Sequence, residues 1–172
     1  MSESWSLDVY KVIKERGYSL AATVPDGGLT ELLQFLEADS DIKVATLTTE
    51  EEGVALLCGA WLGGTNGVLL MQSSGVGNTI NMFSLPRQCR IPVLALVTMR
   101  GGAGESNPWQ IPMGQAVSDV LAAIGVRTYQ ARHQSEVGKV FEEAADYAFN
   151  SRNQAAVLIA QQVIGIKSFE GD

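Results

Sequence analysis

The chain has 172 residues, 46% hydrophobic and 18% charged, enough for one sizeable core and too few for two ordinary domains. Its net charge of −7, without a cluster of Lys or Arg, argues against nucleic acid or an anionic membrane as partner. The single histidine is too few for a His/Cys metal cluster. The two cysteines lie in apolar segments and do not indicate a secreted disulfide framework. With no signal-peptide core and no membrane-length apolar run, we expect a cytoplasmic protein.

Amphipathic and apolar segments alternate along the chain. Apolar residues at helical spacing from Leu7 to Ile13 predict a first helix that ends at Gly17. Strands are predicted at 20–24, 42–47, 67–71, 92–98, 126–129 and 155–160, and helices near 28–38, 50–62, 76–88, 113–124 and 135–149. Nearly continuous apolar strands alternating with helices are typical of a parallel sheet covered on both faces. We therefore predict one doubly wound α/β domain over residues 1–172, with about six mostly parallel strands.

Four loops follow the carboxyl ends of these predicted strands, where such sheets bind ligands. They span residues 25–28, 48–52, 72–78 and 99–113, and they hold most of the glycine, serine, asparagine and carboxylate groups. The last loop is long for a connection between a strand and a helix. Its length indicates an active-site or interface loop.

Three consecutive acids, Glu50 to Glu52, follow Thr48 and Thr49 at a predicted helix start. Either threonine, with the glutamate three positions later, would form a capping box, and acids are favoured at the positive end of a helix. The alternative is that one carboxylate projects into a ligand site. Successive helical side chains point about 100° apart, so the three acids cannot share one role. The local pattern leaves the choice among them open.

A loop rich in serine and glycine, with the sequence QSSGVGN from Gln72 to Asn78, follows a buried strand and opens a helix. Its glycines allow close backbone approach, and free backbone N–H groups favour an anion. It lacks the Lys-Ser/Thr pair of a P-loop and the third glycine of a dinucleotide fingerprint. Ligand contact and plain helix capping both remain open.

Arg100 follows another buried strand and begins the segment RGGAGE. Its guanidinium could pair with a substrate carboxylate or sulfonate, or could form a structural or intersubunit salt bridge. The segment from Gln110 to Gly114 predicts an interface loop that leads into a helix. A serine hydrolase is disfavoured, because no GxSxG motif surrounds Ser73 or Ser74, and His133 lies in a polar stretch typical of the surface.

Taken together, these motifs resemble the pyrimidine-binding domain of thiamine-diphosphate-dependent decarboxylases. The chain is similar in particular to the separate α subunits of sulfopyruvate decarboxylase and to phosphonopyruvate decarboxylase. The resemblance runs from about Leu7 to the C-terminus and is strongest from Thr48 to Gly114. It rests on an ordered series: the acidic helix start, the QSSGxGN loop, the IPV strand, the Arg-Gly pair and QIPMG.

The resemblance selects Glu50 among the three acids, because the family's catalytic glutamate stands nine positions before a helix glycine, here Gly59. In that family the glutamate hydrogen-bonds a ring nitrogen of the cofactor's pyrimidine and helps to activate the thiazolium carbon that attacks the 2-oxo acid. The resemblance further implies a cofactor-binding loop and two substrate-binding candidates. Beside Glu50, the cofactor-binding residues would be Gln72, Ser73, Ser74, Gly75, Gly77 and Asn78, and the substrate-binding residues would be Asp26 and Arg100.

A separate β subunit is also implied, because the sequence lacks the family's Gly-Asp-Gly motif with a later Asn, which holds Mg²⁺ and the diphosphate. We expect thiamine diphosphate to span the interface, Mg²⁺ to be held mainly by the partner, and the α subunits to be paired in a hetero-oligomer. Such an obligate interface would be large and apolar. Met99 precedes the Arg-Gly pair where relatives have His or Trp, which leaves the substrate open.

The expected function is decarboxylation of a 2-oxo acid that carries a second anionic group. The first candidate is 3-sulfopyruvate, which would give sulfoacetaldehyde and carbon dioxide. Alternatives are phosphonopyruvate or another 2-oxo acid, with carboligation as a further outcome. A candidate from a different class is a non-catalytic regulatory or scaffold subunit.

Overall fold

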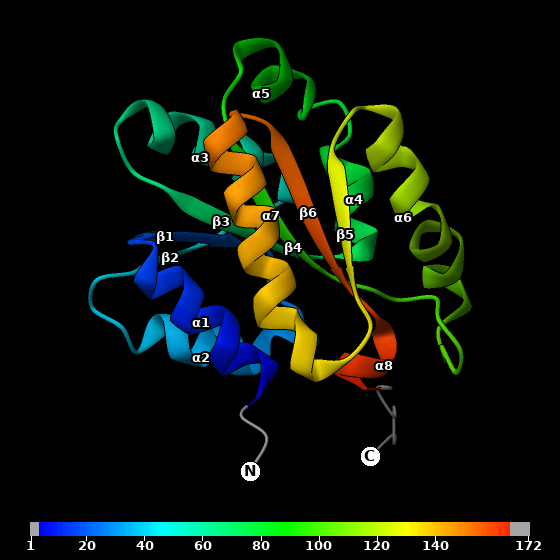
Figure 1. The fold of residues 1–172 in the computed structure, drawn as a ribbon. Helices are drawn as coiled ribbons and strands as arrows, with labels where there is room; N and C mark the ends of the chain where they lie inside the picture. Colours follow the sequence, from blue (N-terminus) through cyan, green and yellow to red (C-terminus); the bar gives the residue numbers. More distant parts are fainter. Residues whose placement is uncertain (1–3, 166–172) are drawn as a thin grey trace.

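The computed structural model describes residues 4–165, in which six strands form a single parallel sheet (Figure 1). Neighbouring strands follow the order β2-β1-β3-β4-β6-β5, and every pair is parallel. The predicted doubly wound α/β fold is therefore confirmed. The ends of the predicted domain 1–172 lie outside the described residues, and its range stays a prediction. The strands are β1 (Leu20–Thr23), β2 (Lys43–Thr46), β3 (Gly67–Gln72), β4 (Val93–Thr98), β5 (Arg127–Ala131) and β6 (Gln154–Ile159).

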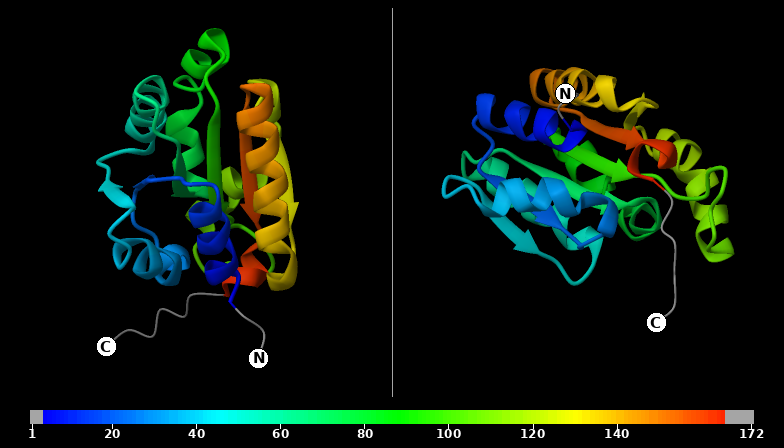
Figure 2. Two further views of the ribbon diagram at one scale, coloured as in Figure 1. Left: turned by 60° about the vertical axis from the view of Figure 1, so that its left-hand side comes forward. Right: turned by 90° about the horizontal axis from the view of Figure 1, so that it is seen from below.

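Helices cover the sheet on both faces (Figure 2). One face carries α1 (Trp5–Glu15), α2 (Thr30–Glu37) and α7 (Val137–Ser151), and the other carries α3 (Glu50–Leu62), α4 (Ser73–Thr79) and α6 (Ile111–Ala123). The remaining helical elements are short. They are α5 (Ser84–Cys89), α8 (Gln161–Ile164), η1 (Gly27–Leu29), η2 (Pro108–Gln110) and η3 (Gln134–Glu136).

The core consists of two apolar layers, one on each side of the sheet. Along β4, Leu94 and Leu96 face the layer under α1, α2 and α7, while Ala95 and Val97 face the layer under α3 and α6. Every residue of β4 and of β6 is buried. This burial on both faces explains why the central strands read as continuous apolar runs.

The predicted helix at 76–88 is wrong in its bounds. The chain turns from β3 directly into α4, which begins at Ser73 and ends at Thr79, and α5 follows only at Ser84. Pro86 explains the break, because its ring would clash with the carbonyl four residues earlier and it has no N–H to donate. The QSSGVGN segment therefore lies mostly in a short helix and not in a loop.

All six strands run in the same direction, so their carboxyl ends meet at one edge of the sheet. The four segments predicted to bind ligand all leave from that edge. Within residues 4–165, no helix combines the length and the apolar character needed to cross a membrane.

Candidate functional site

Glu50 is the first residue of α3 and is buried, with 8% of its surface exposed. Its Oε2 accepts a hydrogen bond of 2.7 Å from Nδ2 of Asn78, which lies 28 residues later at the end of α4. Among residues 4–165, Oε1 of Glu50 has no hydrogen-bond partner. The amino end of α3 favours a negative charge at this position. The structure thus brings together two of the predicted site residues and leaves one carboxylate oxygen available to a ligand.

The other two acids of the run are exposed and point elsewhere. Glu52 accepts a hydrogen bond of 2.8 Å from the backbone N–H of Thr48, while the Thr49 side chain makes no capping bond. Neither predicted capping box is therefore complete. Glu50 and Glu52 therefore make different contacts and Glu51 is exposed, in line with the 100° rotation between helical neighbours.

Gly75 lies directly against the carboxylate of Glu50. A Cβ atom at this position would overlap the Cγ, Cδ and Oε1 atoms of Glu50. Only glycine lets α4 approach the start of α3 this closely. Of the other residues in the segment, Ser73 is buried, whereas Ser74, Gly77 and Asn78 are exposed on the same short helix.

Gly75→Ala should lower the free energy of unfolding by about 1–3 kcal/mol, because the added methyl group must displace the Glu50 carboxylate. Gly59→Ala is the matched control. Gly59 is exposed on α3, nothing lies within 4 Å of the position that an added methyl group would take, and alanine should raise stability by about 0.5–1 kcal/mol. Urea unfolding of the full chain measures both. Equal gains in the two variants would contradict the close packing of Gly75 on Glu50.

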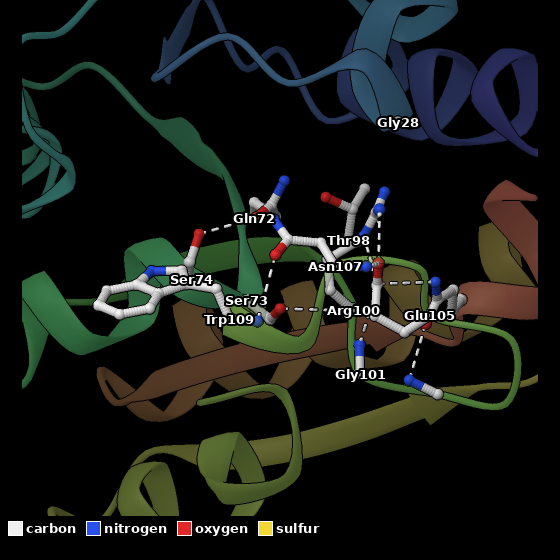
Figure 3. Close-up of polar contacts among 12 residues, drawn as sticks. Gly28, Gln72, Ser73, Ser74, Thr98, Arg100, Gly101, Glu105, Asn107 and Trp109 are labelled. Atoms are coloured by element: carbon white, nitrogen blue, oxygen red, sulfur yellow. Dashed lines mark hydrogen bonds and ion pairs between the residues drawn. The ribbon is translucent and has the colours of Figure 1, made fainter. Parts of the chain in front are cut away.

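Asp26, after β1, accepts hydrogen bonds from at least three donors at the sheet edge. Its Oδ2 accepts from the backbone N–H of Gly28 and from the Thr98 hydroxyl, both at 3.0 Å. Its Oδ1 accepts from Nε2 of Gln72 at 2.8 Å. Gln72 in turn accepts a 2.8 Å hydrogen bond from the Ser74 hydroxyl (Figure 3). Asp26 therefore joins the ends of β1, β3 and β4.

Arg100 is paired with Glu105 inside the protein (Figure 3). Nε and Nη2 of Arg100 donate to the two carboxylate oxygens of Glu105 at 2.9 and 3.2 Å, and the two side chains are 2% and 1% exposed. The arginine, with further hydrogen bonds from the N–H groups of Asn107 and Gly101, lowers the pKa of Glu105 to about 2. The structural salt bridge that the sequence left open is present. Arg100 as an anion contact stays a prediction.

The backbone around Arg100 is fixed to both neighbouring segments. Its N–H donates to the Ser73 hydroxyl at 3.0 Å, which ties the end of β4 to the start of α4. Gly114 packs so closely that a Cβ atom there would overlap the carbonyl of Arg100. The glycine of QIPMG therefore allows α6 to rest on the sheet edge.

A pocket of about 670 Å³ opens between α4 and the 99–113 segment. It is mostly apolar and is lined by Ser74, Asn107, Pro108, Trp109, Pro112 and Met113. Trp109, which is 87% exposed, was not predicted from the sequence as a site residue. A tryptophan inside a long polar loop could have drawn attention, because an aromatic side chain so placed is typical of a binding or interface surface.

Four other residues considered from the sequence lie as follows. Met99 is half-buried and packs against the apolar layer under α3 and α6. His133 is exposed at the start of η3. Cys58 and Cys89 are free thiols, and burial raises the pKa of the Cys58 thiol to about 11.

Comparisons with known proteins identify the family. No family model matches the chain. The α subunit of sulfopyruvate decarboxylase from Methanococcus maripaludis is 36% identical over 152 residues, which are 88% of this chain and 91% of that relative. The chain belongs to the sulfopyruvate decarboxylase α-subunit family. This membership confirms the resemblance seen in the sequence.

Longer relatives also match the chain, and a solved structure shares its fold. A sulfopyruvate decarboxylase from Methanosarcina acetivorans is 32% identical over 90% of this chain, which spans 40% of that protein. A phosphonopyruvate decarboxylase from Streptomyces viridochromogenes is 38% identical over 107 residues, 61% of this chain and 27% of the relative. The 2-oxoglutarate:ferredoxin oxidoreductase from Magnetococcus marinus matches with a TM-score of 0.76 at 13% identity, over 94% of this chain and 29% of its own. That likeness shows a shared fold.

Proposed function

We propose that this chain is the α subunit of a heteromeric, thiamine-diphosphate-dependent decarboxylase that converts 3-sulfopyruvate to sulfoacetaldehyde and carbon dioxide. The observation that carries the proposal is the environment of Glu50, a buried carboxylate at a helix start. One of its oxygens accepts a hydrogen bond from Asn78, and the other is available to a ligand. When bound, the cofactor supplies an electron sink for the loss of carbon dioxide. Glu50 would hold a proton at Oε1 opposite a ring nitrogen of the pyrimidine, and Asn78 would fix the orientation of the carboxylate.

The residues near Glu50 fit the pyrimidine end of such a cofactor. Gly75 brings the α4 backbone up to the carboxylate, and the exposed Ser74, Gly77 and Asn78 offer a surface on which a flat ring could rest. Among residues 4–165, no group of three His, Cys, Asp or Glu side chains could hold a metal ion. We assign Mg²⁺ and the diphosphate mainly to the β subunit, because the sequence of this chain lacks the Gly-Asp-Gly motif with a later Asn.

A partner subunit is supported by the relatives and by the exposed surface. Three relatives that match over 91–92% of their length are α subunits, and a longer relative matches this chain over only 40% of its own length. On the surface, Leu62 of α3 and Trp109 are 73% and 87% exposed. Large exposed apolar side chains of this kind are typical of surfaces that another chain covers.

Phosphonopyruvate is the second candidate substrate, favoured by the 38% identity to a phosphonopyruvate decarboxylase. Both substrates carry a second anionic group on a three-carbon 2-oxo acid. For Arg100 to contact that group directly, its guanidinium would have to leave Glu105. The β subunit is the alternative source of an anion contact.

A substrate panel tests the proposal. The chain is co-expressed with a β subunit that carries the Gly-Asp-Gly and Asn motif, loaded with thiamine diphosphate and Mg²⁺, and carbon dioxide release is measured. We expect turnover of sulfopyruvate at least about tenfold faster in kcat/KM than of phosphonopyruvate or pyruvate, a difference of about 1.4 kcal/mol. A loaded complex that releases carbon dioxide from none of these acids would favour the non-catalytic scaffold subunit.

A further inference from the structure

Asp26, Gln72 and Ser74 form a chain of hydrogen bonds in which the chemistry of the side chains decides which group donates and which accepts. As a carboxylate, Asp26 can only accept, so Gln72 must turn its NH₂ group toward Oδ1. The amide oxygen of Gln72 then faces Ser74 and can only accept as well. The Ser74 hydroxyl must therefore donate to Gln72, which leaves its lone pairs for other partners (Figure 3).

Ser74 presents those lone pairs at the wall of the 670 Å³ pocket. Asn107 is the other polar side chain in the wall, and its Oδ1 already accepts from the backbone N–H of Trp109 at 3.1 Å. Its NH₂ group is the part left to face a ligand. Of the six described residues that line the pocket, none is charged. The pocket thus offers one acceptor, from Ser74, and two kinds of donor, the NH₂ group of Asn107 and the indole N–H of Trp109, on otherwise apolar walls.

We infer that Asp26 is a positioning residue, which acts through Gln72 to hold Ser74 as a hydrogen-bond acceptor in this pocket. A pocket with this polarity suits a neutral, flat group that carries an N–H or O–H donor, and it disfavours an anion. The arrangement of hydrogen bonds does not depend on the proposed function. Only the expected effect on decarboxylation rests on it. The role differs from the direct substrate contact predicted for Asp26 from the sequence.

Asp26→Asn should reverse the chain of hydrogen bonds. The backbone N–H of Gly28 cannot turn away, so the introduced asparagine keeps its carbonyl on Gly28 and Thr98. Its NH₂ group then faces Gln72, whose amide must flip to present its oxygen. The NH₂ group of Gln72 now donates to Ser74, and the Ser74 hydroxyl points its proton at the pocket. Ser74 changes from an acceptor to a donor, while the hydrogen bonds from Gly28 and Thr98, between residues 26 and 72, and between Gln72 and Ser74 each keep a donor and an acceptor.

The double variant Asp26→Asn with Gln72→Glu should restore the original direction. The NH₂ group of the introduced asparagine donates to the introduced glutamate, and that carboxylate accepts from Ser74 as the Gln72 amide oxygen did. The net charge is unchanged. Gln72→Glu alone is the matched control, because it sets two carboxylates against each other where a 2.8 Å hydrogen bond stood.

The first experiment is nuclear magnetic resonance on the full chain and needs neither partner nor ligand. In the wild type, the side-chain amide protons of Gln72 should show nuclear Overhauser effects to the Asp26 methylene group and none to that of Ser74. In Asp26→Asn the effects should move to the Ser74 methylene group. An amide that keeps its wild-type contacts in Asp26→Asn would overturn the inference.

The second experiment measures kcat/KM for carbon dioxide release by the reconstituted complex. Asp26→Asn should lower it by about tenfold, the effect of one hydrogen bond of wrong polarity, and the double variant should recover most of that loss. In a Ser74→Ala background, Asp26→Asn should have no further effect, because its influence passes through the Ser74 hydroxyl. A merely structural Asp26 would lower activity equally in both backgrounds, and that result would overturn the inference. If the complex shows no turnover at all, the proposed function fails, while the resonance experiment still decides the role of Asp26.

Discussion

Glu50→Gln should lower the decarboxylation rate of the complex reconstituted with its β subunit by about 10²–10⁴-fold, the usual contribution of a positioned acid or base. Glutamine has nearly the same volume, and its carbonyl can still accept from Asn78. What is lost is the capacity to hold a proton at the position of Oε1. We therefore expect kcat to fall while the free energy of unfolding changes by less than about 1 kcal/mol. Carbon dioxide release and urea unfolding measure the two quantities.

Glu51→Gln is the control for this substitution. It removes the same charge from the same helix start, but the Glu51 side chain is exposed. We expect its rate to stay close to that of the unchanged complex. The catalytic assignment of Glu50 is wrong if Glu50→Gln keeps the wild-type rate, and it is not specific if both variants lose activity to the same extent.

The fold could be predicted from the sequence because its strands are buried on both faces. Runs such as Val93–Thr98 have no polar alternation, and only a sheet covered on both sides explains them. The bounds of α3 were predicted correctly at 50–62, since the acids mark its start and a glycine pair follows its end. The break between α4 and α5 was missed, although Pro86 gave the signal for it.

The partners of the site residues could not be predicted, because they come from distant parts of the chain. Asp26 meets Thr98 across 72 residues and Gln72 across 46, and no local pattern encodes either contact. The selection of Glu50 needed the family resemblance. Its hydrogen bond to Asn78, 28 residues away, was not predicted, and the catalytic role of Glu50 stays a prediction. The salt bridge of Arg100 was named only as one of two alternatives.

Glu105→Gln should lower the free energy of unfolding by about 3–5 kcal/mol, because it leaves the buried guanidinium of Arg100 without a counter-charge. Glu105 also accepts hydrogen bonds from the N–H groups of Asn107 and Gly101 and from the side chain of Gln161. The glutamine amide would turn a donor toward one of these donors. The loop that carries Trp109 would lose its main anchor to the sheet edge.

The loss should depend on pH in a direction that the pKa of Glu105 fixes. In the folded chain that pKa is lowered from 4.5 to about 2, mainly by Arg100. The carboxylate therefore contributes its full stability above pH 4.5, and this contribution disappears as the pH falls from 4.5 toward 2. Urea unfolding of wild type and variant should give a constant difference at neutral pH and a shrinking one below pH 4.5.

Glu143→Gln provides the comparison, because Glu143 pairs with Lys139 at 3.9 Å on the surface, where both side chains are more than half exposed. Its loss should cost less than about 1 kcal/mol. A similarly small effect of Glu105→Gln would mean that the guanidinium of Arg100 is easily released from its carboxylate. Arg100 would then be free to meet the second anionic group of the substrate, which is one of the two alternatives that the sequence left open. A large effect instead fixes Arg100 as the anchor of the 99–113 segment, and the anion contact would then have to come from another group, such as one on the proposed β subunit.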